Sequence, residues 1–251
     1  MISKNKIKFI NSLTLKKYRD ESGLFIAEGD KIIQELISAG FSFETLILTE
    51  KYNAEFESVN CEKIIAADSE IKKISSRETP PGIIAVCKKK QVQFSLADIR
   101  NKIVIALDGI QDPGNLGTII RLASWFGIDN IICSLNTVDC YNPKVIQSTM
   151  GAIAHVDIIY TDLLNFLADA RRNGIHIFGT FLDGINIYKS NGLNNGIIVF
   201  GNEGNGISKE IESIVETKVL IPSFNNNIVV ESLNVSMAAA IAISEFKRRS
   251  I

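Results

Sequence analysis

The sequence predicts an α/β protein of two domains, and three observations lead to this fold class. Runs typical of strands and runs typical of helices alternate along the chain. Its 251 residues are enough for one large domain or two small ones. A polar stretch, Lys88-Lys89-Lys90-Gln91, interrupts the alternation. We therefore place a boundary near residues 90–98 and predict domains 1–92 and 93–251.

The first domain is predicted to be a small α/β unit. Apolar residues between Phe9 and Tyr18 indicate an N-terminal helical region. A second helix begins at Asp30, shows apolar residues at helical spacing and ends at Gly40. The other predicted elements are strands at 23–29, 44–49, 63–66 and 83–87 and a helix at 68–76.

The second domain continues the alternation. Its predicted strands lie near 102–107, 130–133, 156–160, 175–181, 196–200 and 218–221. Its predicted helices lie near 115–126, 143–152, 162–173, 208–215 and 234–249. Strands that are each followed by a helix favour a parallel sheet.

Composition excludes several classes of protein. No apolar run reaches the roughly 18–20 residues of a membrane span, and the N-terminus lacks the apolar stretch of a signal peptide, so we expect a cytoplasmic protein. The four cysteines show no Cys-x-x-Cys spacing, and the two histidines, His155 and His176, have no neighbours at ligand spacing. We therefore expect reduced thiols and no metal.

The N-terminal segment is basic although the whole chain has a net charge of -1. Its first 19 residues contain no acidic residue. Such a segment can contact RNA phosphates, although a solvated helix face explains the charges equally simply. The candidate RNA-binding residues are Lys4, Lys6, Lys8, Lys16, Lys17 and Arg19.

A strand, turn and helix at residues 102–126 form the first candidate site. Asp112-Pro113-Gly114 predicts a sharp turn, and Asn115 stands where a helix N-cap is expected. Arg121 lies about a turn and a half further on, among apolar neighbours. Open α/β sheets bind ligands at the carboxyl ends of their strands, so both side chains are candidates for a site, with a purely structural role as the alternative.

Two further polar loops follow predicted strands. Gly201-Asn202-Glu203-Gly204-Asn205-Gly206 lacks the glycine order of a dinucleotide-binding loop and the Gly-Lys-Ser/Thr ending of a Walker loop. The third loop leads from Ile221-Pro222 to Glu231-Ser232-Leu233-Asn234-Val235-Ser236, whose polar residues could also cap the last helix. In a parallel sheet such loops emerge at one edge and can build one pocket.

These three stretches, in this order, resemble the motifs of the SpoU (TrmH-type) RNA ribose methyltransferases of the SPOUT superfamily. Asn142-Pro143-Lys144 and Ser148-x-Met150-Gly151-Ala152 are similar to the same family. Residues 1 to about 90 resemble its substrate-recognition domain, which is similar to an RNA-binding ribosomal protein. The link at 223–231 is longer than is usual in the family and lacks its glycine.

The resemblance implies a fold, a reaction and an assembly. The expected fold is a parallel-sheet SPOUT domain with a deep trefoil knot, preceded by the ribosomal-protein-like domain. The expected reaction is methyl transfer from S-adenosylmethionine to a ribose 2'-hydroxyl, with ribosomal RNA favoured over transfer RNA as substrate. The family works as homodimers whose active site draws on both subunits.

Site residues follow from the resemblance by position. Those expected to hold the reaction are Asn115, Arg121, Glu203, Ser232 and Asn234. Those expected around the cofactor are Thr180, Gly201, Ile221 and Leu233, together with Ser232 and Asn234.

The three motifs contain no ordinary base for the 2'-hydroxyl. Guanidinium groups are nearly always charged at neutral pH, so we expect Arg121 to bind phosphate and stabilise alkoxide charge, with proton removal by Arg121 as the alternative. Our hypothesis is that Glu203 pairs with Arg121 and orients it. Two other readings of the chain remain, a non-catalytic RNA-binding protein of the same fold and a nucleotide-dependent oxidoreductase, which the glycine order disfavours.

Overall fold

A computed structural model describes residues 2–190, 192, 194–225 and 232–249. The chain divides into two compact units, Met1–Gln91 with Asp139–Ala154, and Val92–Val138 with His155–Ile251. Residues 139–154, which we expected in the second domain, therefore belong to the first unit. The short helix α7 (Pro143–Thr149) explains this, because it packs on strand β1 (Leu24–Glu28).

The first unit is built on a four-stranded mixed sheet in the order β1-β4-β2-β3. Strand β4 (Ile83–Lys88) is antiparallel to both β1 and β2 (Phe43–Leu48), and β3 (Glu62–Ile65) is parallel to β2. Its other helices are α1 (Lys4–Ser12), α2 (Lys16–Ser22), α3 (Asp30–Ser38), α4 (Glu50–Asn53) and α5 (Asp68–Ile71). A core that includes Ile10, Leu13, Ile26, Ile47 and Ile84 joins α1 to this sheet.

The second unit contains a six-stranded parallel sheet in the order β10-β8-β9-β5-β6-β7. The strands are β5 (Ile103–Asp108), β6 (Asn130–Ser134), β7 (Asp157–Thr161), β8 (Ile177–Asn186), β9 (Gly196–Gly201) and β10 (Thr217–Leu220). The α/β prediction and the parallel sheet are confirmed. Strands β5 and β9 are neighbours, and Asp108 pairs with Gly201, so the loops that follow them begin side by side.

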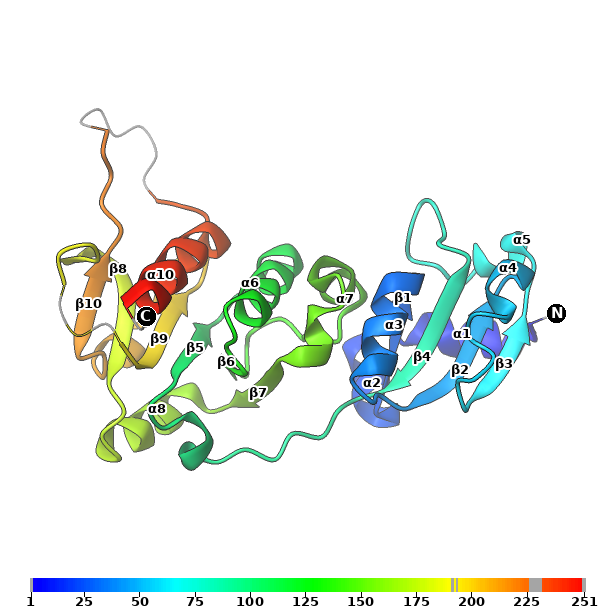
Figure 1. Ribbon diagram of the computed structural model, residues 1–251, viewed down its shortest axis with the longest axis horizontal. Helices are drawn as coiled ribbons and strands as arrows, with labels where there is room; N and C mark the ends of the chain where they lie inside the picture. Colours follow the sequence, from blue (N-terminus) through cyan, green and yellow to red (C-terminus); the bar gives the residue numbers. More distant parts are fainter. Residues whose placement is uncertain (1, 191, 193, 226–231, 250–251) are drawn as a thin grey trace. The chain divides into compact units, whose positions relative to one another are not determined.

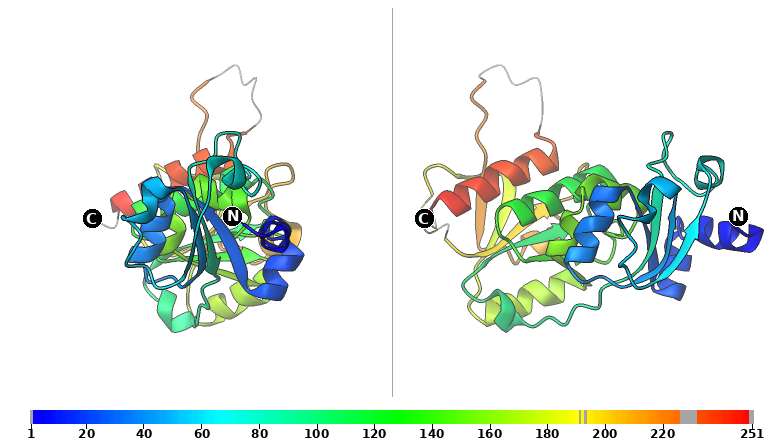
Figure 2. Two further views of the ribbon diagram at one scale, coloured as in Figure 1. Left: turned by 90° about the vertical axis from the view of Figure 1, so that its right-hand side faces the viewer. Right: turned by 45° about the vertical axis from the view of Figure 1, so that its right-hand side comes forward.

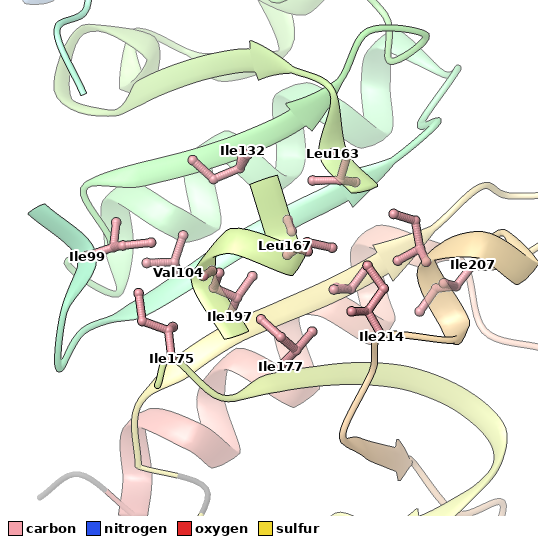
Figure 3. Close-up of a cluster of buried hydrophobic side chains, with 14 residues drawn as sticks. Ile99, Val104, Ile132, Leu163, Leu167, Ile175, Ile177, Ile197, Ile207 and Ile214 are labelled. Atoms are coloured by element: carbon pink, nitrogen blue, oxygen red, sulfur yellow. The ribbon is translucent and has the colours of Figure 1, made fainter. Parts of the chain in front are cut away.

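Helices cover both faces of the parallel sheet. Figure 3 shows Leu163 and Leu167 of α8 (Leu163–Arg172) among isoleucine and valine side chains of the strands. On the opposite face, α6 (Pro113–Trp125) and α10 (Val235–Arg249) lie side by side (Figures 1 and 2). The remaining helices are α9 (Lys209–Glu212) and two 3-10 turns, η1 (Leu96–Ile99) and η2 (Ala152–His155).

Three predicted helices are clearly shorter in the structure. Backbone angles explain the early end of one, and hydrogen bonds to a carboxylate accompany the early end of another. The helix predicted at 143–152 ends at Thr149 because Met150 and Gly151 have positive φ angles of 52° and 96°. The helix predicted at 68–76 ends at Ile71, and the Ser75 hydroxyl and the Ser76 hydroxyl and backbone N–H donate to the carboxylate of Glu28. The helix predicted at 208–215 covers Lys209–Glu212.

The pairing of β8 with β10 contains a wide irregularity. Lys218 pairs with Gly179, whereas the next residue, Val219, pairs with Ile185. Residues 180–184 therefore bulge out of the ladder at the carboxyl side of β8. Among the described residues no helix has the length and apolar composition needed to cross a membrane.

Candidate functional site

Helix α6 begins at a cap that frees the side chain of Asn115. The carboxylate of Asp112 accepts a hydrogen bond from the Asn115 backbone N–H at 2.8 Å, and Pro113 occupies the first helical turn. The expectation that Asn115 is the N-cap was wrong, because the N-cap is Asp112, three residues earlier. Asn115 is buried, so its side-chain amide must find partners inside the protein.

Those partners come from the other two loops. The Asn115 Nδ2 donates to Glu203 Oε1 at 3.1 Å, and its Oδ1 accepts from Asn234 Nδ2 at 3.0 Å. The Asn234 Oδ1 in turn accepts from the backbone N–H of Ser236 at 2.9 Å, at the start of α10. We call Asn234, Asn115 and Glu203 the polar chain. It joins three stretches that lie up to 119 residues apart in the sequence.

The orientation of each amide in the polar chain is fixed by its neighbours. An ionised carboxylate only accepts hydrogen bonds, so Asn115 must turn its nitrogen toward Glu203 and its oxygen toward Asn234. The helical N–H group of Ser236 only donates, so Asn234 must turn its oxygen toward α10. Both requirements agree, and every donor in the chain therefore points from the N-terminus of α10 toward Glu203.

The carboxylate of Glu203 also holds the turn before α6. It accepts the backbone N–H groups of Gln111 and Asp112, each at 3.1 Å. Partial burial raises the pKa of Glu203, but the hydrogen bonds from Asn115 and from backbone N–H groups outweigh burial and lower the pKa below its ordinary value. Glu203 is therefore an ionised acceptor at neutral pH.

Two braces that sequence reasoning missed hold the glycine loop. The Asn202 Nδ2 donates to the Gly109 carbonyl at 2.7 Å, while its Oδ1 accepts two N–H groups of its own loop. The Asp108 carboxylate, at the end of β5, accepts the Ser208 N–H at 2.8 Å. The sequence did contain a signal for Asp108, because a charged residue at the end of a buried apolar strand indicates a functional or structural contact. A Cβ on Gly201 would lie 2.1 Å from the Gly206 carbonyl carbon, so this position requires glycine.

The residues expected around the cofactor lie within strand β8, at the end of β9 and after β10, three strands that are adjacent in the sheet. Thr180 opens the bulge of β8 and donates its hydroxyl to the Val199 carbonyl at 3.3 Å. Gly201 ends β9, and Ile221 directly follows β10. Ser232 and Leu233 are exposed and precede α10. Residues 226–231 of the long link lie outside the described residues.

Arg121 does not join the polar chain. It is exposed on α6 and lines an open groove of about 750 Å³ between α6 and α10. Among the described residues Arg121 has no ion pair. The carboxylate of Glu203 accepts from Asn115, from the backbone N–H groups of Gln111 and Asp112 and, at 3.5 Å, from Asn202 Nδ2. The hypothesis that Glu203 pairs with Arg121 is therefore wrong within one chain. Other residues of the groove are Thr118, Leu122, Trp125, Phe126, Tyr188, Ala240, Ile241, Ser244 and Glu245.

The candidate RNA-binding cations fall into three groups. Arg19 is 1% exposed, and its guanidinium bonds to Asp139 at 2.6 and 2.8 Å and to two backbone carbonyls, which removes Arg19 from the candidates. Lys6 bonds to Thr45 and to Glu62 at 2.7 Å. The other four lysines are exposed. Lys16 and Lys17 form surface ion pairs with Asp20 and Glu21, respectively, and Lys4 and Lys8 are the other two. The side-chain partners of Arg19 and Lys6 come from distant sequence, so the N-terminal segment alone could not reveal them.

No metal centre is visible in the described part of the chain, where no group of three or more His, Cys, Asp or Glu residues is arranged to hold an ion. The groups gathered at the sheet edge are neutral amides, the carboxylates of Asp108, Asp112 and Glu203, and backbone N–H and C=O. Such a set can orient a ligand by hydrogen bonds.

Comparison with known proteins gives matches over both units. Residues 102–244 match the SpoU rRNA Methylase family, and residues 4–85 match the MRM3-like substrate binding domain. A Bacillus subtilis protein, 23S rRNA (guanosine(2553)-2'-O)-methyltransferase RlmP, is 28% identical over 240 residues, which cover 95% of this chain and 94% of that protein.

Two solved structures extend the similarity to the whole fold. A TrmH-family protein from Porphyromonas gingivalis shares 36% identity at a TM-score of 0.89, covering 100% of both chains. The AdoMet-bound rRNA methyltransferase from Sinorhizobium meliloti shares 27% identity at a TM-score of 0.87, covering 100% of this chain and 98% of that one.

Proposed function

This chain belongs to the SpoU rRNA Methylase family, and on that premise we propose that it transfers a methyl group from S-adenosylmethionine to a ribose 2'-hydroxyl of ribosomal RNA. The observation that carries the proposal is the polar chain. It brings the three family motifs together at the carboxyl edge of a parallel sheet, where α/β proteins bind ligands.

The residues at this edge fit S-adenosylmethionine. Backbone groups at the bulge of β8 and after β9 and β10 offer donors and acceptors for the adenosine and amino-acid parts. Leu182 and Leu233 are 71% and 51% exposed and suit an apolar contact with adenine. We assign cofactor contacts to Thr180, Gly201, Ile221 and Leu233, with Ser232 beside them. When bound, the cofactor supplies an activated methyl group on a sulfonium.

The chain's own residues align the reactants and handle charge. Glu203 is a poor base for a hydroxyl proton, because its pKa is lowered and its oxygens accept hydrogen bonds already. We therefore assign Glu203, Asn115 and Asn234 to positioning the loops. Arg121 carries the positive charge that binds an RNA phosphate and stabilises the alkoxide as it forms.

We also propose a homodimer that forms through the groove between α6 and α10. Trp125, which lines this groove, is 86% exposed, and Met237 on α10 is 58% exposed. Large apolar side chains on two neighbouring helices favour burial against a second copy. Arg121 lies in the same groove, so the dimer brings it to an active site made by both subunits. We also propose that the second unit carries the trefoil knot of the family.

The first unit supplies RNA recognition. Its residues 4–85 match a substrate binding domain, which is the reason to favour ribosomal RNA over transfer RNA. Lys4, Lys8, Lys16 and Lys17 remain the proposed phosphate contacts of this unit, each contributing salt-dependent affinity.

The test is transfer of labelled methyl from S-adenosylmethionine to unmodified ribosomal RNA and transfer RNA, followed by digestion to nucleosides. A labelled 2'-O-methylnucleoside from ribosomal RNA is the expected result. Label on transfer RNA alone would change the substrate class. Absence of both transfer and cofactor binding would support the non-catalytic alternative.

A further inference from the structure

The loop that follows β6 is fixed by hydrogen bonds. The Ser134 hydroxyl accepts the Gly109 N–H at 2.8 Å, and the Val138 N–H donates to the Ile110 carbonyl at 2.8 Å. Thr137 is buried, and its hydroxyl lies 3.0 Å from that of Ser134. This loop nevertheless leaves Leu135 70% exposed. A single exposed leucine has no meaning by itself, so its surroundings decide what it can do.

Beside this loop, Gln111 presents an oriented acceptor. Its Nε2 donates to the Asn136 carbonyl at 2.6 Å and lies 3.4 Å from the Gly109 carbonyl. Both partners only accept, so the amide oxygen of Gln111 must point away from them. Among the described residues no donor reaches this oxygen, and Gln111 is exposed. The backbone N–H of Gln111 bonds to Glu203, which fixes the residue at both ends.

The charges around Leu135 and Gln111 select the kind of ligand. The charged groups that bond to this turn or flank it are Glu203, Asp112 and Asp108, and these carboxylates repel phosphate. The loop itself contributes leucine, asparagine and threonine. Leu135 directly precedes Asn136, to which the Gln111 amide bonds, so an exposed apolar side chain and an oriented amide oxygen come from neighbouring points of one surface. Such a pair suits a flat, neutral ring that carries an N–H donor on its edge, which describes a nucleobase.

We propose that Leu135 and Gln111 receive the base of the nucleotide that is methylated, with Leu135 against the ring and the Gln111 Oε1 accepting an N–H from its edge. This inference rests on the proposed methyltransferase function. The two ligands then occupy different parts of the sheet edge. The base lies on the β6 side of Glu203, and the residues assigned to the cofactor lie on the side of β9, β8 and β10. The two residues set base specificity and take no part in the chemical step.

The test measures initial rates of methyl transfer against RNA concentration at saturating S-adenosylmethionine, with cofactor affinity measured by calorimetry. Leu135→Ser and Gln111→Met are each expected to lower kcat/KM for RNA about tenfold, with cofactor affinity unchanged within about twofold. Leu164→Ser is the matched control, because Leu164 is also an exposed leucine of this unit but lies on α8. Its kcat/KM should stay at the wild-type value.

A second comparison isolates the hydrogen bond. After the target is mapped, an RNA whose target base lacks N–H donors on its Watson–Crick edge should be methylated equally by the wild type and by Gln111→Met. Transfer by the wild type with unchanged rates in both variants would overturn this inference alone. Loss of cofactor affinity in Leu135→Ser would also overturn it, by placing Leu135 at the cofactor. Absence of any transfer by the wild type would overturn the proposed function and the inference with it.

Discussion

Replacing Asn115 by Asp tests the polar chain most directly. The substitution keeps the size of the side chain but replaces the donor that faces Glu203 by a second carboxylate, 3.1 Å from the first. At an effective dielectric constant of about 20, two full charges at this distance repel by about 5 kcal/mol. Glu203 is exposed, so water screens much of this energy. We expect a loss of about 2 kcal/mol of unfolding free energy near pH 8.

The loss should depend on pH in a defined direction. In the variant one carboxyl of the pair keeps its proton, so its folded-state pKa lies above its unfolded value. The stability that such a group contributes is present below its unfolded pKa and is lost as the pH rises through the folded pKa. The deficit of Asn115→Asp should therefore be larger near pH 8 than near pH 5, where it should fall below about 1 kcal/mol.

Urea unfolding at the two pH values measures this deficit, and methyl transfer should fall at least about 100-fold because the motif loops lose their link. Asn165→Asp is the matched control. Asn165 also donates its amide to a carboxylate, that of Asp162 at 2.8 Å, but both residues are exposed. It should change stability by no more than about 0.5 kcal/mol. An Asn115→Asp deficit that is the same at both pH values would refute the reasoning.

Three further predictions concern charged residues. Arg121→Lys should reduce methyl transfer about 100-fold and leave cofactor affinity unchanged, because lysine lacks the planar guanidinium; retained turnover would contradict the assignment. Arg19→Met should lower the unfolding free energy by about 3–5 kcal/mol, because it leaves Asp139, whose side chain is only 10% exposed, without its ion-pair partner; calorimetry of Arg19→Met with Asp139→Leu should show partial recovery. Glu245→Gln should cost about 1–2 kcal/mol at neutral pH, about half of that near pH 3 and little near pH 2, as followed by thermal unfolding.

The pH dependence of Glu245→Gln follows from its surroundings. Hydrogen bonds from Arg248, and then from Arg249, lower the pKa of Glu245 from 4.5 to about 2. A group with a lowered folded-state pKa contributes stability above its unfolded pKa, and this is lost as the pH falls through the folded value. The difference between variant and wild type should therefore shrink below about pH 4.5. Because Arg248 is largely exposed, water screens its ion pair with Glu245. This pair therefore contributes less to the unfolding free energy than the lowered pKa of Glu245 alone would indicate.

Local patterns were enough to predict most elements of the fold. The strand at 102–107 and the helix at 162–173 were predicted within a residue or two, because apolar periodicity records which face of an element is buried. Helix ends were less well predicted. The helix predicted at 143–152 ends at Thr149 because the next residue, Met150, adopts a positive φ. Methionine rarely adopts this conformation, so its presence in the sequence does not predict a helix end there.

The sequence by itself determined the fold class, the order of the motifs and the residue types at the site, because these depend on periodicity and on local spacing. Only the tertiary structure decided which side chains pair. Asn115 bonds to Glu203 and Asn234 because β5 and β9 are neighbours in the sheet and α10 begins beside α6. Arg19 is buried because Asp139 comes to it from 120 residues away. Hydrogen bonds and ion pairs depend on separation in space, and the order of residues along the chain does not specify that separation.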